Sequence, residues 1–355
     1  MFKKIILVLC LPLTLAGCSL SLTASPTQNQ GGVYKSTDNG FTWVQQATVV
    51  LPDGKLSTLG NLDANVIGID PSDAKALYYG SVGNGLFYSL DAAGSFAEAT
   101  ALGPINIQAM AVDPNTKDAR AKCVVYAASQ NRLLKTVDCA RTWTQVYFDN
   151  DTGVLVSQVA VDGYNDQLVY LTTDKGTLLK SVNGGGSWSM VKQFNDKIIK
   201  LVINPNDTRE LFVATAGNGL WHSANQGGVW DSLQGALKTF PDSNSVRDLA
   251  IAKSNPGVIL LATNYGLLKS IDHGKDWTSI QLIAPQQQAN INSVAISNND
   301  VKQIFYVTDN ALYATTDGGT TWAARQLPTT RPAGEIIIDQ KNQGTLYLVT
   351  KVKSS

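Results

Sequence analysis

The sequence predicts an all-β protein folded as a seven-bladed β-propeller with four-stranded blades. Three observations lead to this prediction. One short phrase recurs seven times at intervals of 42 to 53 residues, a spacing typical of repeat architectures. Between the copies lie short apolar runs separated by Gly-, Pro- and Asn-bearing turns, and four such runs make one propeller blade. The third observation is that each end of the chain carries half of a unit.

The recurring phrase is Ser or Thr, any residue, Asp or Asn, then Gly near the fifth place and Trp at the eighth. Asp or Asn accepts backbone N–H bonds within its own turn, and Gly supplies a positive φ. Trp then opens the next strand and buries a large surface. Phe96 replaces Trp in the second copy, and Trp221 lies outside the phrase. We therefore expect structural roles for the third residue of each copy: Asp38, Asp91, Asp138, Asn183, Asn225, Asp272 and Asp317.

The strands of a unit follow one another in a constant order, as the second unit illustrates. A short apolar strand at 66–69 ends in the polar turn DPSD, and a β-rich run at 77–81 follows it. A Gly-bearing turn leads to the third strand at 86–89, and the repeated phrase at 89–96 turns the chain into the outer strand. No segment beyond the N-terminus shows helical periodicity, so each unit predicts four antiparallel strands.

The two half-units explain the number of blades. After the first 31 residues the chain opens with the second half of a unit, and residues 335–350 supply the first half of another. Joined, they make one complete sheet, so we expect the N- and C-terminal strands to share a blade and close the ring. Closure removes the exposed strand edges that an open array would leave. The sequence therefore predicts a single propeller domain over residues 32–355.

The N-terminus has the features of a bacterial lipoprotein signal peptide at residues 1–17. A basic start at Lys3 and Lys4 precedes an apolar core, and Leu15-Ala16-Gly17-Cys18 resembles a lipobox. We expect Cys18 to carry the lipid anchor, residues 18–31 to form a flexible tether, and the protein to be exported. It would then face the extracytoplasmic side of the bacterial cell membrane or outer membrane. An ordinary signal peptide with an incidental Cys is the alternative.

Composition restricts the classes of partner. Charged residues make up 16% of the chain and are balanced, with 28 basic against 28 acidic. No basic stripe marks a nucleic-acid groove, so we expect no nucleic-acid partner. Only His222 and His273 are available as imidazole ligands, and both lie beside repeated phrases, so no metal site or other cofactor is expected. A monomeric ring is the expected assembly.

Cys123 and Cys139 both belong to the third unit. Cys123 begins its second strand, and Cys139 lies in the turn after its third strand. A hairpin turning at Gln130-Asn131 would place Cys123 opposite Asp138, one residue from Cys139. That separation permits a disulfide in an oxidising compartment, and two free thiols are the alternative.

The repeated phrase resembles the Asp-box, or BNR, hairpin of sialidases, sortilin, xyloglucanases and the photosystem II assembly-factor-like propellers. The resemblance covers the chain from Gly32 to the C-terminus. In these families the boxes lie at the periphery of the lower face, away from the active side. The resemblance therefore implies that the opposite face of this ring is the working face.

The predicted working face carries a polar arc around the channel mouth. Aligning the seven inner strands places one residue of each at the mouth: Val66, Ala109, Gln158, Lys200, Asp248, Ser293 and Glu335. The residues from Gln158 round to Glu335 are polar and form the arc. The same side carries long connecting loops at Gln45–Asn65 and Ser232–Asn244, and variable loops on a rigid scaffold are a common place for recognition. The candidate ligand-binding residues are Gln158, Lys200, Arg247, Asp248, Tyr265 and Glu335. A merely solvated mouth is the alternative, and in either case we expect substitutions there to leave stability nearly unchanged.

Three functions compete. The first is a non-enzymatic, membrane-anchored propeller that binds a protein or glycan of the cell envelope or assists assembly there, as the photosystem II assembly-factor-like family implies. The second is polysaccharide binding or xyloglucanase-like glycoside hydrolysis, which needs two carboxylates roughly 5 to 10 Å apart. Asp248 and Glu335 are the best candidates for that pair. The third is a sortilin-like peptide receptor. We expect the first, with no catalytic residues.

Overall fold

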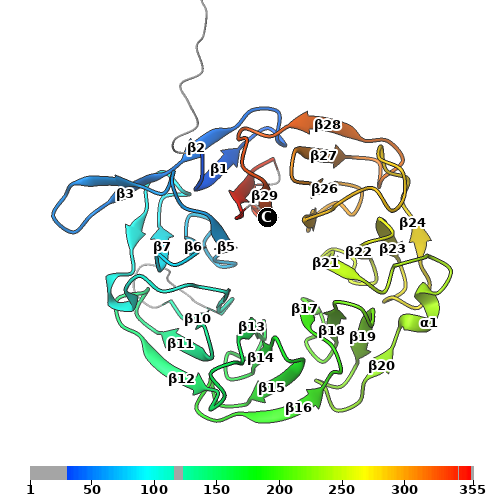
Figure 1. Ribbon diagram of the computed structural model, residues 1–355, viewed down its shortest axis with the longest axis horizontal. Coiled ribbons are helices and arrows are strands. Elements are labelled where there is room, and N and C mark those ends of the chain that lie inside the picture. Colours follow the sequence, from blue (N-terminus) through cyan, green and yellow to red (C-terminus); the bar gives the residue numbers. More distant parts are fainter. Residues whose placement is uncertain (1–29, 116–122, 343, 353–355) are drawn as a thin grey trace, which may run out of the picture.

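The chain closes into a ring of seven four-stranded antiparallel sheets around a central channel (Figure 1). The structure is a computed structural model, and it describes residues 30–115, 123–342 and 344–352. The predicted leader and Cys18 lie outside these ranges. Blades are numbered in the order of the repeated phrases, so blade 1 is the one that both ends of the chain share.

Each blade contributes one strand to each of four concentric positions. The inner strands, in blade order, are β29 (Ala333–Ile338), β5 (Ala64–Ile69), β9 (Ala109–Val112), β13 (Val156–Val161), β17 (Ile198–Ile203), β21 (Val246–Ile251) and β25 (Ser293–Ile296). The second strands are β30 (Leu346–Thr350), β6 (Leu77–Ser81), β10 (Val125–Ser129), β14 (Val169–Thr173), β18 (Leu211–Thr215), β22 (Ile259–Thr263) and β26 (Ile304–Val307). The third strands are β1 (Val33–Ser36), β7 (Leu86–Ser89), β11 (Arg132–Thr136), β15 (Thr177–Ser181), β19 (Leu220–Ser223), β23 (Leu267–Ser270) and β27 (Ala311–Thr315). The outer strands are β2 (Val44–Gln46), β8 (Ala97–Glu98), β12 (Thr144–Phe148), β16 (Ser189–Gln193), β20 (Asp231–Ser232), β24 (Thr278–Ser279) and β28 (Ala323–Gln326).

Blade 1 closes the ring as predicted. Its strands run in the order β2-β1-β30-β29, and β1 pairs antiparallel with β30 so that Val33 lies opposite Val349. The N-terminal and C-terminal segments therefore complete one sheet, and the inner strand β29 contacts β5 of blade 2. The predictions of seven blades, four strands per blade and a shared closing blade are confirmed.

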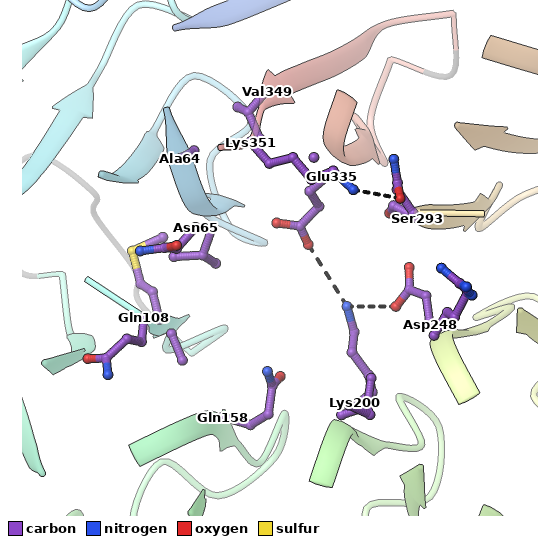
Figure 2. A pocket seen from close by; sticks show the side chains of 17 residues that line it. Ala64, Asn65, Gln108, Gln158, Lys200, Asp248, Ser293, Glu335, Val349 and Lys351 are labelled. Carbon is purple, nitrogen blue, oxygen red and sulfur yellow. Dashed lines mark hydrogen bonds and ion pairs between the residues drawn. The ribbon is translucent and has the colours of Figure 1, made fainter. Parts of the chain in front are cut away.

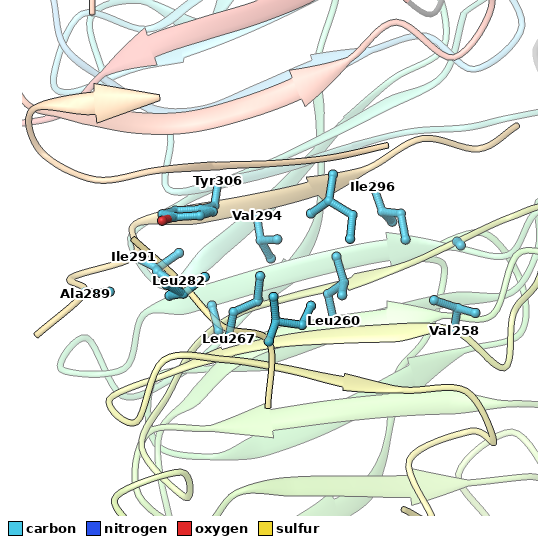
Figure 3. Close-up of a cluster of buried hydrophobic side chains, with 13 residues drawn as sticks. Val258, Leu260, Leu267, Leu282, Ala289, Ile291, Val294, Ile296 and Tyr306 are labelled. Atoms are coloured by element: carbon cyan, nitrogen blue, oxygen red, sulfur yellow. The ribbon is translucent and has the colours of Figure 1, made fainter. Parts of the chain in front are cut away.

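The hydrophobic core lies between neighbouring blades. Between blades 6 and 7, Leu260 and Leu267 pack with Val294, Ile296 and Tyr306 (Figure 3). The second strands are buried on both faces, which explains why they read as continuous apolar runs and not as an alternating pattern. Truncating one such side chain, for example Leu260→Ala, should cost about 2–5 kcal/mol.

The repeated phrases form turns with a shared set of hydrogen bonds. In blade 7, Thr315 Oγ1 donates to Asp317 Oδ1 at 2.7 Å, and the Thr321 N–H donates to the same oxygen at 3.0 Å. Thr321 Oγ1 donates to Asp317 Oδ2 at 2.6 Å. Gly319 has a φ of +96°, which an L side chain adopts only at a cost. These bonds explain why an oxygen acceptor stands third in the phrase, and an exclusively structural role for the seven residues stays a prediction.

Lysine and tyrosine side chains tie consecutive blades together. We call the turn that each repeated phrase forms a box turn. Lys135 Nζ and Tyr126 Oη both donate to the carbonyl of Gly184, in the box turn of the next blade, at 2.8 and 2.9 Å. Lys135 Nζ also lies 5.1 Å from the centroid of the Tyr126 ring. Lys180 repeats the arrangement over Tyr170 one blade further round. Contacts of this kind hold neighbouring blades in a fixed relative position.

The long connecting loops carry the remaining elements. Loop 45–65 folds into a hairpin of β3 (Thr48–Val50) and β4 (Leu56–Thr58), which projects outward from the ring in Figure 1. Val49 forms a bridge with Phe96, the residue that replaces Trp in the second phrase. Short helical turns occur at η1 (Thr100–Leu102) and α1 (Gln234–Leu237). Within the described ranges, no helix has the length and apolar character needed to cross a membrane.

Candidate ligand-binding site at the channel mouth

The beginnings of the inner strands enclose a cavity of about 290 Å³ at one end of the channel (Figure 2). All seven residues that the strand alignment predicted line it: Val66, Ala109, Gln158, Lys200, Asp248, Ser293 and Glu335. Arg247 lines it as well. Tyr265 does not line the cavity. Its ring packs edge-to-face against the ring of Phe240, with the two centroids 5.3 Å apart. Lys351, which follows the last strand, lines the mouth and was missed by the sequence argument.

β-Bulges explain why two successive residues of an inner strand both face the cavity. The register between the inner and second strands shifts between Ile198 and Lys200, and the same happens between Val246 and Asp248. Blades 1, 2 and 4 shift at the corresponding place. A bulge sets two residues against one on the partner strand and redirects their side chains. Arg247 and Asp248 therefore both line the mouth, which strict alternation would forbid.

An ion cluster crosses the channel immediately below the mouth. Lys200 Nζ lies 3.1 Å from Asp248 Oδ1 and 3.9 Å from Glu335 Oε1. Figure 2 shows the lysine side chain extending from β17 toward the centre of the ring, between the two carboxylates. A second cavity, of about 220 Å³, lies deeper in the channel and shares Lys200, Asp248 and Glu335 with the mouth. The cluster thus separates two parts of the channel.

Backbone N–H groups complete the bonding of both carboxylates. Asp248 Oδ2 accepts from the Val294 N–H at 2.9 Å, and its Oδ1 accepts from its neighbour Leu249 at 2.9 Å. Glu335 Oε2 accepts from the Ile67 N–H of blade 2 at 3.1 Å. Each carboxylate therefore joins its own blade to the next one, and Lys200 of blade 5 binds both carboxylates.

The electrostatics of the cluster follow from these contacts. Asp248 and then Glu335 hold the pKa of Lys200 above its ordinary value, against the opposing effect of burial. Burial raises the pKa of Glu335, while Lys200 and the Ile67 N–H work in the opposite direction. Lys200 therefore stays charged at neutral pH and acts as a fixed cation within the channel.

The rim above the cluster offers side-chain amides and two cations. Arg247 is exposed, and its Nε donates to Asn264 Oδ1 at 2.8 Å. Lys351 Nζ lies 3.2 Å from Asp309 Oδ1 and donates to Asn292 Oδ1 at 2.7 Å. The Gln158 side chain makes no hydrogen bond within the described part of the chain, and Figure 2 shows it pointing into the cavity. Its amide is free to bind a ligand.

Other candidate groups lie away from the mouth. Cys123 and Cys139 form a disulfide with a Cα–Cα distance of 4.8 Å beside the box turn of blade 3. Glu210 accepts from Nε2 of His222 and Nδ1 of His273, a contact between blades 5 and 6 that sequence reasoning did not anticipate. Among residues 30–115, 123–342 and 344–352, no group of three or more His, Cys, Asp or Glu is placed to hold a metal ion.

Part of the sequence is similar to known enzymes. No family model matches the chain. Xyloglucanase Xgh74A of Acetivibrio thermocellus is 27% identical over 191 residues, and a Paenibacillus sp. xyloglucanase is 26% identical over 193. Each match covers 48% of this chain but only 19% and 16% of the relative, so the chain spans a small part of these enzymes.

Solved structures resemble the chain over nearly its whole length. The Niastella koreensis GH74 enzyme superimposes with a TM-score of 0.63 at 16% identity, covering 90% of this chain and 53% of that one. YCF48 bound to D1 peptide gives 0.62 at 12% identity, covering 92% and 97%. YCF48 from Cyanidioschyzon merolae gives 0.58 at 11% identity, covering 80% and 94%. The chain is a seven-bladed β-propeller. At these identities, the likeness to GH74 and YCF48 propellers establishes the shared fold.

Proposed function

We propose that this propeller is a non-enzymatic binding protein of the cell envelope, and that it holds a segment of a partner protein at its channel mouth. The observation that carries the proposal is the state of the two mouth carboxylates. Asp248 is 5% exposed, and both it and Glu335 are bound to Lys200 and to backbone N–H groups. The hydrogen bonds of both carboxylates hold neighbouring blades together.

Glycoside hydrolysis makes different demands on a carboxylate pair. One carboxyl must exchange a proton with the leaving oxygen, and the other must face the sugar or a water molecule, with the scissile bond between them. In this ring the Lys200 ammonium occupies the space between Asp248 and Glu335. A substrate would have to displace a charge that both carboxylates stabilise. The arrangement therefore supports a binding role.

The rim chemistry suits a polypeptide. Side-chain amides carry both donors and acceptors, as peptide groups do, and Asn65, Gln108, Gln158 and Asn292 line the cavity. Within the described part of the chain, Gln158 has both amide atoms available, whereas the other three amides already bond to neighbouring residues. Arg247 is exposed and adds positive charge for an acidic side chain or a C-terminal carboxylate, whereas Lys351 already pairs with Asp309. The full-length structural likeness to YCF48 bound to D1 peptide is consistent with a peptide ligand.

Gln30, the first residue that the structure describes, lies near the mouth and follows the predicted lipid anchor at Cys18 by 12 positions. The backbone carbonyl of Gln30 accepts a hydrogen bond from Thr329 Oγ1 at 2.9 Å, and Oε1 of its side chain accepts one from the Thr330 N–H at 2.8 Å. Both threonines lie in the loop that leads into β29, at the mouth end of the ring. Residues 19–30 can span at most about 40 Å between Cys18 and this point. With Cys18 lipidated, the mouth would lie close to the membrane, where a membrane protein or its exposed segment could reach it.

Site-specific cross-linking in cells tests this proposal. A photo-reactive amino acid replaces Gln158 at the mouth or, as the control, Tyr164, which is 70% exposed at the opposite end of the channel. Illumination should yield one cross-linked protein from position 158 and not from position 164. Equal products from both positions, or none from position 158, would contradict a partner at the mouth.

A xyloglucanase-like hydrolase is the second candidate. Sequence similarity to xyloglucanases over half the chain favours it, as does the raised pKa of Glu335, since a general acid must hold its proton near neutral pH. If hydrolysis occurs at the mouth, the wild-type protein should release oligosaccharides from xyloglucan, and Glu335→Gln should abolish the release. We expect no release from either protein.

A further inference from the structure

Blade 5 departs from the repeat at two adjacent positions. Two residues before the repeated phrase, the other blades have Tyr34, Phe87, Leu134, Leu179, Leu268 and Tyr313. Blade 5 has Trp221 at this place, the one Trp that the phrase does not account for. His222 follows it where blades 1, 3, 4 and 6 have lysine. Trp221 lines a pocket that the channel-mouth function does not use.

The pocket lies on the flank of the ring, between the outer parts of blades 4 and 5. It has a volume of about 370 Å³, within the range of small-molecule sites. Trp221 and Phe194 form its apolar wall, with ring centroids 5.6 Å apart in an edge-to-face contact. None of its lining residues lines the channel mouth. We call it the flank pocket.

Several polar groups of the flank pocket have no partner in the described part of the chain. The side-chain amides of Asn195 and Gln234 make no hydrogen bond there, and both residues line the pocket. Trp221 Nε1 is buried without an acceptor. A buried indole N–H ordinarily finds a partner, so this donor is unusual. The wall of the pocket thus combines an aromatic ring with unused donors and acceptors.

Lys192 supplies an uncompensated positive charge. Its Nζ lies 5.0 Å from the Trp221 ring and 5.4 Å from the Phe194 ring, and it makes no ion pair within the described ranges. The nearby carboxylate of Asp196 is already used. It accepts from the N–H groups of Lys197, Gly217 and Asn218. The cation is therefore available to an acidic ligand.

We propose that the flank pocket binds a pyranose ring of an acidic polysaccharide, one whose sugar carries a carboxylate. The apolar C–H face of the sugar would pack on Trp221, and its hydroxyls would bond to the amides of Asn195 and Gln234. Its carboxylate would pair with Lys192, in a charge-assisted contact stronger than the cation–ring contact that it replaces. This proposal is independent of the peptide proposed at the mouth, because the two sites share no residue.

Calorimetric titration with two probes of equal length tests the proposal. One probe is a galacturonate trisaccharide, and the other is cellotriose, which is uncharged. The wild-type protein should bind the acidic probe at least tenfold more tightly than the neutral one. Trp221→Leu introduces the residue that three other blades have at this position, so the fold should tolerate it, and the variant should lose binding of the acidic probe at least tenfold.

Two further variants make the test specific. Lys192→Gln should remove the preference for the acidic probe, and because this side chain is only half-buried the variant remains informative even if Trp221→Leu is unstable. Tyr313→Leu changes the equivalent position in blade 7 and should bind as the wild type does. Wild-type affinity in Trp221→Leu, an unchanged preference in Lys192→Gln, or a wild-type protein that prefers cellotriose or binds neither probe would overturn the proposal.

Discussion

Lys200 and Glu335 face each other across the channel, with Nζ of the lysine 3.9 Å from Oε1 of the glutamate, although their inner strands β17 and β29 lie three blades apart. The lysine is therefore long enough to connect opposite sides of the ring. Asp248 lies between them in the circle of blades and binds the same ammonium. The residues at the mouth of this propeller therefore hold blades together, and they also form a candidate ligand surface.

Because of these contacts, we expect the stability of the folded protein to depend on Asp248. Asp248→Ala would leave the N–H groups of Leu249 and Val294 without their acceptor and Lys200 without its nearest anion. We expect a loss of about 3 kcal/mol in the free energy of unfolding. Urea denaturation measures it. Arg247→Ala, one residue earlier and exposed, is the matched control and should cost under about 0.5 kcal/mol.

The sequence predicts that mouth substitutions leave stability nearly unchanged, whereas the contacts of Asp248 and Lys200 lead us to expect a loss of stability when either is replaced. The sequence-based prediction treats both as surface residues, but Asp248 is buried and both are bound across blades. For Arg247, which is exposed, the sequence-based prediction of little change remains. Equal stability of Asp248→Ala and Arg247→Ala would show that the cluster contributes nothing to the ring.

The box turns should give the protein an acid-sensitive stability. Hydrogen bonds from Thr42 and Ser36 lower the pKa of Asp38 to about 2. A carboxylate with a lowered pKa in the fold stabilises it above the unfolded pKa of about 3.9, and this contribution is lost as pH falls toward 2. The melting temperature should therefore fall over this range.

The chain provides a matched pair of variants for this effect. Asn183 occupies the same place in blade 4 and accepts the equivalent N–H bond, from Ser187 at 2.8 Å. Asp38→Asn should make the melting temperature less dependent on pH between about 4 and 2, and Asn183→Asp should make it more dependent. An identical slope in both variants and the wild type would rule out the carboxylates as the cause.

The disulfide between Cys123 and Cys139 should stabilise blade 3. The two residues are separated by 16 positions, so the bond closes a short loop that should contribute roughly 3 kcal/mol through the unfolded state. The double variant Cys123→Ser, Cys139→Ser should show this loss in denaturant. Peptide mass spectrometry without reduction should find the linked pair, and two alkylatable thiols in protein from its native compartment would refute it.

The predicted anchor can be tested by fractionation. The wild-type protein should sediment with membranes and be released by detergent, because acyl chains on Cys18 bury apolar surface in the bilayer. Cys18→Ser should appear in the soluble fraction. An intact Met1 in the wild-type protein, found by N-terminal sequencing, would show that the leader is not processed as a lipoprotein.

The sequence was sufficient to predict the ring, because every blade repeats the same turn and the same apolar strands. It also placed Lys200, Asp248 and Glu335 at one level, since aligned repeats occupy equivalent positions around an axis. It could not predict the bulge before Asp248, which depends on the register with β22. It misplaced Tyr265, because a loop position does not reveal that the ring packs on Phe240.

Longer-range contacts escaped prediction for a similar reason. The hydrogen bond that the Ile67 N–H donates to Glu335 joins residues 268 positions apart, and nothing in either local sequence indicates it. The flank pocket arises where the end of β16 meets Trp221, and only the packing of two blades creates it. Trp221 itself was visible as a departure from the repeat, which is the signal that could have directed attention to that place.

The most direct test of the proposed function is the yield of the cross-link from position 158 in three backgrounds: wild type, Arg247→Glu and Asp317→Ala. Arg247→Glu reverses a charge at the mouth and should reduce the yield severalfold while leaving the melting temperature nearly unchanged. Asp317→Ala removes the acceptor of a box turn on the opposite face, so it should lower the melting temperature and leave the yield unchanged. An Asp317→Ala protein that loses the cross-link with stability intact, or an Arg247→Glu protein that keeps it, would show that the partner does not bind at the mouth.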